Sequence, residues 1–330
     1  MGIASWLAGG LAAASVVMAL PSALEGAGGL VRRIMGGSDA NYNDYTFIVY
    51  MYNEKEKTFC GGSIISDDWI LTAAHCIKTA TKDQMLVYVG MAEYKLDIAK
   101  GTKVAEVRTH PRYNDQTMAN DIALIRLQQP VSGKGVSSIQ IDSSSVGDGV
   151  TVTALGWGYT SPTSKKASPQ LKKGDFKTLS QQQCGSIDSG FTGNNGPRIC
   201  VAADRGPDTC PGDSGGPLIR QVGGKNVLVG ITSFGTAGNK AVPNQCGGAG
   251  MVSLFTHASY FKSFIDSTAG ALREVEGKGK PGSNSTSDND SGATSPSGSA
   301  ADGKSSAGPA SVLSIAAIAG LAALTTLANI

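Results

Sequence analysis

The chain has 330 residues, of which 41% are hydrophobic and 16% charged, and this composition is typical of a protein with a substantial buried core. Its 28 basic residues nearly balance its 26 acidic ones and form no long run, so we expect no nucleic-acid partner. The six cysteines are an even set without CxxC spacing. They predict three disulfides in an oxidising compartment and not a zinc site.

The amino-terminal segment has the pattern of a secretory signal. Residues 1–24 contain no charged side chain and include an apolar stretch, residues 11–20, that is followed by small residues. We take residues 1–19 as the signal peptide, with Ala23 as an alternative end. Residues 20–33 then form a propeptide.

The carboxyl-terminal segment predicts a tether. Residues 273–309 are rich in Ser, Gly, Ala and Asp and have almost no large apolar side chain, so they predict a disordered stalk. Two sequons in this stalk, at Asn284 and Asn289, predict glycosylation.

The last residues, 310–330, are apolar, and no charge follows Lys304. A transmembrane helix is usually followed by basic residues on its cytoplasmic side, whereas the signal for a glycosylphosphatidylinositol (GPI) anchor ends in its hydrophobic tail. We therefore favour a lipid anchor attached at Ser299, with Gly298 or Asp302 as alternatives. It would hold the secreted protein on the outer face of the plasma membrane.

The middle of the chain consists of short, β-branched apolar runs separated by turn residues. The clearest runs are residues 46–52, 69–72, 85–89, 122–127, 151–155 and 227–233. This pattern predicts an all-β fold, with antiparallel barrels or a sandwich. One helix is expected near the end, where an apolar face is formed by Tyr260, Phe261, Phe264, Ile265 and Leu272.

Ser214 is a candidate nucleophile because it lies in the segment GDSGGPL, where glycines allow a sharp turn that leaves the side chain accessible. A serine hydroxyl needs a neighbouring base, and a neutral imidazole is the usual one. His75 stands in LTAAHC directly after an apolar run, whereas His110 and His257 fit structural roles.

A carboxylate is also needed to orient the imidazole, and Asp121 in NDIALIRL is the candidate. GxSxG also occurs in α/β-hydrolases, but their chain order of Ser, acid and His would require His257 here, without the strand–turn–helix context. The order His75, Asp121, Ser214 is that of chymotrypsin. With these motifs, IMGG at residues 34–37 and GWG at residues 156–158, the chain resembles the trypsin and chymotrypsin family of serine proteases over about residues 34–271.

The resemblance implies two packed six-stranded antiparallel β-barrels and a C-terminal helix, within a protease domain at residues 34–272. It implies one of the 15 possible disulfide connectivities: Cys60–Cys76, Cys184–Cys200 and Cys210–Cys246. We expect a monomer that needs no cofactor. We assign no metal either, because the loop around Met91, which binds calcium in some relatives, has few acidic residues.

The resemblance also assigns chemistry. His75 would activate Ser214 for attack on a protein or peptide substrate, Asp121 would orient His75, and backbone N–H groups of Gly212 and Ser214 would form an oxyanion hole. Arg33 would be the cleavage point of a zymogen, cut by another protease or by the enzyme itself. The new amino group on Ile34 would then pair with Asp213.

Substrate preference would depend on Asp208, six residues before Ser214, because a carboxylate at the base of the pocket favours Arg or Lys. Ser233, Gly235 and Ser253 complete the implied substrate-binding residues. Ser253 stands where the family commonly has Gly and would narrow the pocket or shift the preference between Arg and Lys. Phe234 replaces the usual Trp beside the substrate backbone.

Two other classes of function stay open on the sequence. A non-catalytic homologue would bind or inhibit a partner at the surface, and an adhesin would use only the stalk and anchor. Homologues of the first kind usually lack a member of the triad, and this chain has all three.

Overall fold

The computed structural model describes residue 2 and residues 34–131, 135–161, 166–203, 206–238 and 246–270. The predicted signal peptide, Arg33, the stalk with Asn284 and Asn289, and the tail after Ser299 all lie outside the described residues. The chain divides into residues 1–275 and 276–330, and every described residue belongs to the first unit. Among the described residues, no helix is long and apolar enough to cross a membrane.

The first half of the domain is a closed antiparallel barrel with the strand order β2-β3-β4-β7-β6-β5. Its strands are β2 (Ile48–Asn53), β3 (Thr58–Ile64), β4 (Trp69–Thr72), β5 (Met85–Tyr88), β6 (Thr102–Thr109) and β7 (Ala123–Leu127). Strands β4 and β5 are buried along their whole length. A strand covered on both faces has no polar alternation, which explains their continuous apolar sequence.

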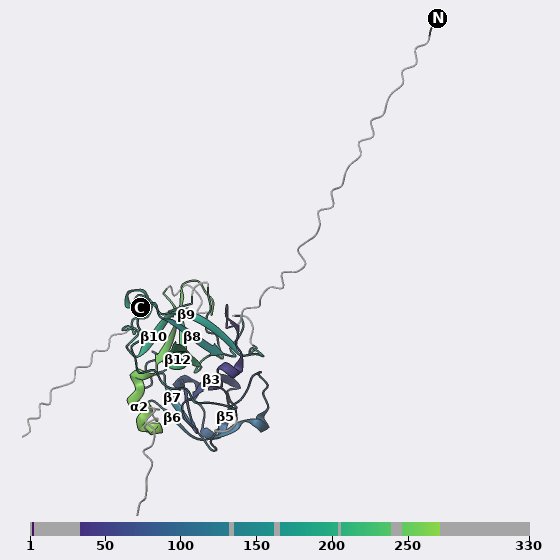
Figure 1. Ribbon diagram of the computed structural model, residues 1–330, viewed down its shortest axis with the longest axis vertical. Coiled ribbons are helices and arrows are strands. Elements are labelled where there is room, and N and C mark those ends of the chain that lie inside the picture. The colour runs from purple at the N-terminus through teal and green to yellow at the C-terminus, as the bar shows by residue number, and fades with distance from the viewer. Residues whose placement is uncertain are drawn as a thin grey trace, which may run out of the picture. The chain divides into compact units, whose positions relative to one another are not determined.

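The second half is a sheet with the order β1-β9-β8-β11-β12-β13-β10. Its strands are β1 (Ser38–Asp39), β8 (Thr151–Gly156), β9 (Lys172–Lys177), β10 (Arg198–Ala202), β11 (Pro217–Val222), β12 (Lys225–Ala237) and β13 (Met251–His257). A bridge between Thr178, which follows β9, and Val201 on β10 joins the two ends of the six long strands. In Figure 1, the labelled strands β8, β9, β10 and β12 group apart from β3, β5, β6 and β7.

The helices are short. They are α1 (Gln181–Gly185), α2 (Lys262–Ala269), and the 3₁₀ turns η1 (Tyr42–Asp44), η2 (Ala74–Cys76), η3 (Lys82–Gln84), η4 (Ile98–Lys100) and η5 (Ser259–Phe261). Helix α2 packs on the first barrel, where Phe261 and Ile265 are buried and the ring of His110 contacts Phe264 at 4.9 Å between centroids. Phe261, Phe264 and Ile265 of the predicted apolar face therefore form the packing face, whereas Tyr260 is exposed and Leu272 lies outside the described residues.

Aromatic rings pack at the junction of the two halves. Tyr50 on β2 stacks on Phe59 of β3 at 5.3 Å and meets Trp157, which directly follows β8, edge-on at 6.2 Å. The two halves thus share one continuous core at this point. The predicted all-β fold is confirmed.

Three disulfides join Cys60 to Cys76, Cys184 to Cys200 and Cys210 to Cys246, and no described cysteine is free. These are the three pairs that the family resemblance implies. Loops of this length restrict the unfolded chain, and each such bond contributes about 2–4 kcal/mol to stability.

Candidate active site

The first barrel brings His75 and Asp121 together. His75 lies in η2, directly after β4, and Asp121 lies two residues before β7, the strand that pairs with β4. The Nδ1 of His75 lies 2.8 Å from Asp121 Oδ2, and the backbone N–H of His75 donates to Oδ1 at 2.9 Å. Because a carboxylate only accepts, Nδ1 carries the proton and leaves Nε2 as the basic nitrogen.

Asp121 is held by further donors from the second half. Ser233 on β12 donates its hydroxyl to Asp121 Oδ2 at 2.5 Å, and Thr256 on β13 donates to the Asp121 carbonyl at 2.8 Å. Burial alone would raise the pKa of the Asp121 carboxyl, but hydrogen bonds from His75 and Ser233 and the charge of His75 lower it. The carboxylate therefore stays ionised although its side chain is fully buried.

The backbone around Ser214 contacts β3 and the end of β4, next to the turn that contains His75. Its carbonyl accepts from Gly61 N at 2.7 Å, and Gly61 follows Cys60, which is bonded to Cys76. A Cβ on Gly215 would lie 2.3 Å from Thr72 Oγ1 and 3.3 Å from Ala73 N, so only glycine fits beside the segment before His75. Among the described residues no hydrogen bond joins Ser214 Oγ to His75 Nε2, a contact that in proteases often tightens only when substrate binds.

The turn before Ser214 leaves two N–H groups pointing at no protein acceptor. Among the described residues, neither Gly212 N nor Ser214 N donates a hydrogen bond within the protein. Gly212 has φ +99°, and a Cβ at this position would lie 2.1 Å from the Phe59 ring. Both the backbone conformation and the close ring therefore require glycine, as an anion-binding turn does.

Asp213 points away from this turn into the interior. Its carboxylate accepts from Gly158 N at 2.8 Å and Cys210 N at 2.9 Å. A Cβ on Gly156 or Gly158 would come within 2.1 or 2.4 Å of the Asp213 carboxylate, which explains the two glycines of the GWG motif. Burial raises the pKa of Asp213 to about 7 because, among the described residues, no cation pairs with it.

The start of the domain lies along the same region. The side chain of Ile34 is buried among the core residues of the second half, such as Val146 and Phe176. Asp208 N donates to the carbonyl of Met35 at 2.8 Å, and Met35 forms an antiparallel bridge with Asp208. The predicted activation segment and the predicted pocket floor are therefore direct neighbours.

Asp208 is buried with donors on both carboxylate oxygens. Ser253 Oγ donates to Oδ1 at 2.6 Å, and Gly247 N donates to Oδ2 at 2.6 Å. Ser253 itself is fully buried on β13, opposite Gly235 of β12. Burial raises the pKa of the Asp208 carboxyl, although the hydrogen bonds from Ser253 and Gly247 oppose this shift.

A cluster of Cys60, His75 and Cys76 places potential metal ligands within 4.8 Å of one another. Both cysteines are joined in one disulfide, and a disulfide sulfur is not the thiolate that binds metals. The bond instead ties β3 to the turn that carries His75.

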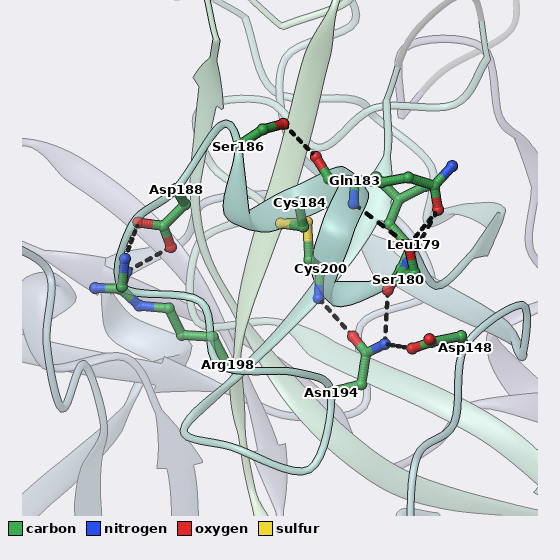
Figure 2. Close-up of a disulfide and its surroundings, with 11 residues drawn as sticks. Asp148, Leu179, Ser180, Gln183, Cys184, Ser186, Asp188, Asn194, Arg198 and Cys200 are labelled. Atoms are coloured by element: carbon green, nitrogen blue, oxygen red, sulfur yellow. Dashed lines mark hydrogen bonds and ion pairs between the residues drawn. A yellow bond between two sulfur atoms is a disulfide. The ribbon is translucent and has the colours of Figure 1, made fainter.

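Two residues of this region, Ser233 and Arg198, make contacts that were not predicted from the sequence. Ser233 was expected to line the substrate pocket, and the structure directs its hydroxyl to Asp121. Arg198 had no predicted role, but its guanidinium contacts Asp188, Thr117 and Phe234. No local motif signals these contacts: Asp121 and Thr117 are far from their partners in the chain, and Asp188, which contacts Arg198 (Figure 2) and precedes it by ten residues, stands in no recognisable motif with it.

The chain is similar in sequence to known proteins. The family profile described as Trypsin matches residues 34–265. Brachyurin from Leptuca pugilator is 34% identical over 242 residues, which cover 72% of this chain and 99% of that protein. Trypsin alpha from Drosophila melanogaster is 31% identical over 241 residues, covering 73% and 89%. Trypsin from Saccharopolyspora erythraea is 32% identical over 203 residues, covering 61% and 86%.

Proposed function

The chain belongs to the trypsin family of serine proteases, and we propose that it is a secreted endopeptidase that cleaves after Arg or Lys through His75, Asp121 and Ser214. The observation that carries this proposal is the pair of contacts from Asp121 to the ring and backbone of His75. They fix the tautomer that a general base needs.

In the proposed reaction, His75 Nε2 takes the proton of Ser214 Oγ as that oxygen attacks the peptide carbonyl. The resulting oxyanion binds the free N–H groups of Gly212 and Ser214. His75 then gives the proton to the leaving amine, and water hydrolyses the acyl-enzyme by the same steps in reverse. Asp121 stays ionised throughout and stabilises the imidazolium that forms in each half of the reaction.

We propose further that the protein is made as a zymogen that is cut after Arg33. The buried carboxyl of Asp213, whose pKa is raised, supports this, because no cation among the described residues pairs with it and it lies next to the turn of Gly212. An α-amino group on Ile34 would supply the charge, and breaking such a buried pair costs about 3–5 kcal/mol. Arg33→Gln is expected to give an uncut precursor with little activity.

The preference for basic residues rests on Asp208 at the end of the pocket. Its hydrogen bond from Ser253 occupies one oxygen that an arginine side chain would otherwise use. A guanidinium gains most from two parallel hydrogen bonds, whereas an ammonium binds as a point charge. We therefore propose that Ser253 moves the preference toward Lys relative to a pocket with Gly at this position.

The test is labelling with a fluorophosphonate after activation, followed by hydrolysis of fluorogenic Lys and Arg peptides. Wild type should be labelled at Ser214, and the Ser214→Ala and Arg33→Gln variants should not. Absence of labelling in correctly cut wild type would favour the alternative, a non-catalytic homologue that binds a partner at the surface.

Attachment to the cell surface by a lipid anchor at Ser299 stays part of the proposal. Phosphatidylinositol-specific phospholipase C should release the protein from cells. If none were released, a transmembrane helix would replace the anchor.

A further inference from the structure

An aromatic ring from the first barrel supports the turn of the proposed oxyanion hole. A Cβ on Gly212 would lie within 3.0 Å of three atoms of the Phe59 ring. The ring therefore contacts the Cα of Gly212 on the side where any other residue would have its side chain. Gly61, two residues after Phe59 on β3, donates its N–H to the Ser214 carbonyl. Strand β3 thus contacts both residues whose N–H groups would form the hole.

The direction of the Gly212 N–H depends on the peptide bond between Pro211 and Gly212. The carbonyl of Pro211 accepts from Tyr159 N at 2.9 Å. In a planar trans peptide the carbonyl and the N–H point to opposite sides, so the N–H of Gly212 points away from Tyr159. A glycine at φ +99° has no side chain that opposes rotation of this peptide. The surrounding contacts must therefore hold it in place.

Three tyrosine rings pack around Phe59. Its ring stacks on Tyr50 at 5.3 Å and on Tyr94 at 6.2 Å between centroids, and it meets Tyr159 edge-on at 5.8 Å. Tyr50 is fully buried and also packs against Tyr94 at 4.9 Å. Aromatic pairs prefer offset and edge-on geometries, so these contacts fix the orientation of the Phe59 ring as well as its position. Phe59 cannot turn away from Gly212 without disturbing them.

Tyr94 belongs to the loop between β5 and η4. Its N–H donates to the carbonyl of Pro169 at 2.7 Å, and Glu93 forms an antiparallel bridge with Gln170. This loop of the first barrel is therefore bonded to the second half by its backbone. The two backbone contacts keep the Tyr94 ring against Phe59.

We propose that Phe59, supported by Tyr50 and Tyr94, is a positioning residue for the Gly212 N–H of the oxyanion hole. This inference rests on the function proposed above. Phe59 acts through the backbone of Gly212 and not by binding substrate. It therefore stabilises the oxyanion, which forms only during the reaction, more than it stabilises the bound substrate. Its loss lowers kcat and leaves KM nearly unchanged.

The experiment compares Phe59→Leu, Tyr94→Ala and Tyr94→Phe in the activated enzyme. The substrate is a peptide with Lys before an aminocoumarin leaving group, so that contacts to residues after the cleaved bond do not contribute. Phe59→Leu should lower kcat by about 10-fold, less than the roughly 100-fold that loss of a whole donor costs. Tyr94→Ala should lower kcat by about 3-fold, the contribution of one ring pair. Tyr94→Phe keeps the ring and should have wild-type kcat.

A trifluoromethyl ketone on the same peptide probes the hole directly. Ser214 Oγ adds to its carbonyl carbon, the carbon–oxygen π bond breaks, and the Ser214 proton passes to His75, so the adduct places an oxyanion in the hole. Hydrogen bonds to this oxyanion lower its affinity for a proton. A fluorine NMR titration should show this affinity about 10-fold higher in Phe59→Leu than in wild type, in parallel with kcat. Benzamidine, a cation that fits the proposed pocket alone, should bind unchanged.

Phe47→Leu is the matched control. It makes the same substitution at a buried phenylalanine of the first barrel, whose ring packs edge-on against Tyr45 at 6.3 Å. It should lower the free energy of unfolding, as Phe59→Leu does, and leave both kcat and the proton affinity of the adduct at the wild-type value.

The proposal would be overturned if Phe59→Leu kept the wild-type kcat and adduct, or if Phe47→Leu lowered kcat equally. Equal losses in Tyr94→Phe and Tyr94→Ala would refute the role of the Tyr94 ring. Fluorophosphonate labelling of wild type separates the inference from the proposed function. A labelled, active wild type with no effect of Phe59→Leu refutes only the inference. An activated wild type that is neither labelled nor active refutes the proposed function as well.

Discussion

Replacing Asp213 by Asn in the uncut precursor should change how stability depends on pH. Asp213 is buried without a cation among the described residues, and its pKa is raised from 3.8 to about 7. Folding therefore raises proton affinity, and the folded precursor binds one more proton than the unfolded chain between these values. Wild-type stability accordingly falls as the pH rises from about 4 to about 7, and the variant lacks this loss.

The magnitude follows from the shift. A change of about three pKa units corresponds to about 4 kcal/mol of unfolding free energy. Asn also faces two N–H donors, of Gly158 and Cys210, with only one oxygen, which costs about 1–3 kcal/mol at every pH. We therefore compare the free energy of unfolding of the variant with that of wild type at pH 8 and at pH 4. From pH 4 to pH 8, this free energy should change by about 4 kcal/mol in favour of the variant.

Urea unfolding of the precursor measures this difference. Arg33→Gln and Ser214→Ala should be present in both proteins to prevent cleavage. Asp142→Asn is a control with the opposite sign: burial alone would raise the pKa of Asp142, but hydrogen bonds from Ser144 and Arg220 lower it. Wild type therefore gains stability from Asp142 as the pH rises, and the stability of this variant relative to wild type should fall.

In the cut protein, carrying only Ser214→Ala, the effect of Asp213→Asn should reverse at neutral pH. In the proposed switch, Asp213 would then pair with the amino group of Ile34, and loss of this pair would destabilise the cut protein. If the unfolding free energy of the Asp213→Asn precursor did not rise relative to wild type between pH 4 and pH 8, the Asp213 carboxyl would not be an unpaired buried acid. The argument for a switch driven by this charge would then fail.

Three further predictions concern catalysis. Asp121→Asn should lower kcat by about 10,000-fold, as the same change does in this family, with KM little changed; near-normal turnover would remove Asp121 from the triad. Gly212→Ala should lower kcat by at least about 100-fold, because the Cβ collides with Phe59 and displaces an N–H of the proposed oxyanion hole; retained thermal stability would separate this from misfolding. Ser253→Gly should raise kcat/KM for Arg over Lys substrates by about 10-fold, since it frees one oxygen of Asp208; an unchanged ratio would show that Ser253 does not act on the pocket.

The strands that could be predicted from the sequence are those with a continuous, mostly apolar run. The run at residues 69–72 coincides with β4 (Trp69–Thr72), and the run at 151–155 differs from β8 (Thr151–Gly156) by one residue. Strand β9, with the sequence KKGDFK, was not predicted, because it alternates charged residues with buried ones and contains a glycine. The glycine is needed, since a Cβ at Gly174 would lie 2.7 Å from Pro207.

The candidate site also has parts that could be predicted from the sequence and parts that could not. His75, Asp121 and Ser214 stand in local motifs that identify them as a candidate base, acid and nucleophile. The donors that hold them do not: Ser233 is separated from Asp121 by 112 residues, and Thr256 by 135. Pairing over such distances depends on the register of β12 and β13, which the composition of either strand leaves open.

The division of the candidate site between the two halves also sets the order in which its parts form during synthesis. The first barrel contains His75 and Asp121, whereas Ser214 lies in the second half, between β10 and β11. Domains fold as units during synthesis, at about 5–20 residues per second. A ribosome-bound chain that has completed only its first barrel thus has the candidate base and acid but not the candidate nucleophile, and the candidate site is complete only when nearly the whole domain has emerged.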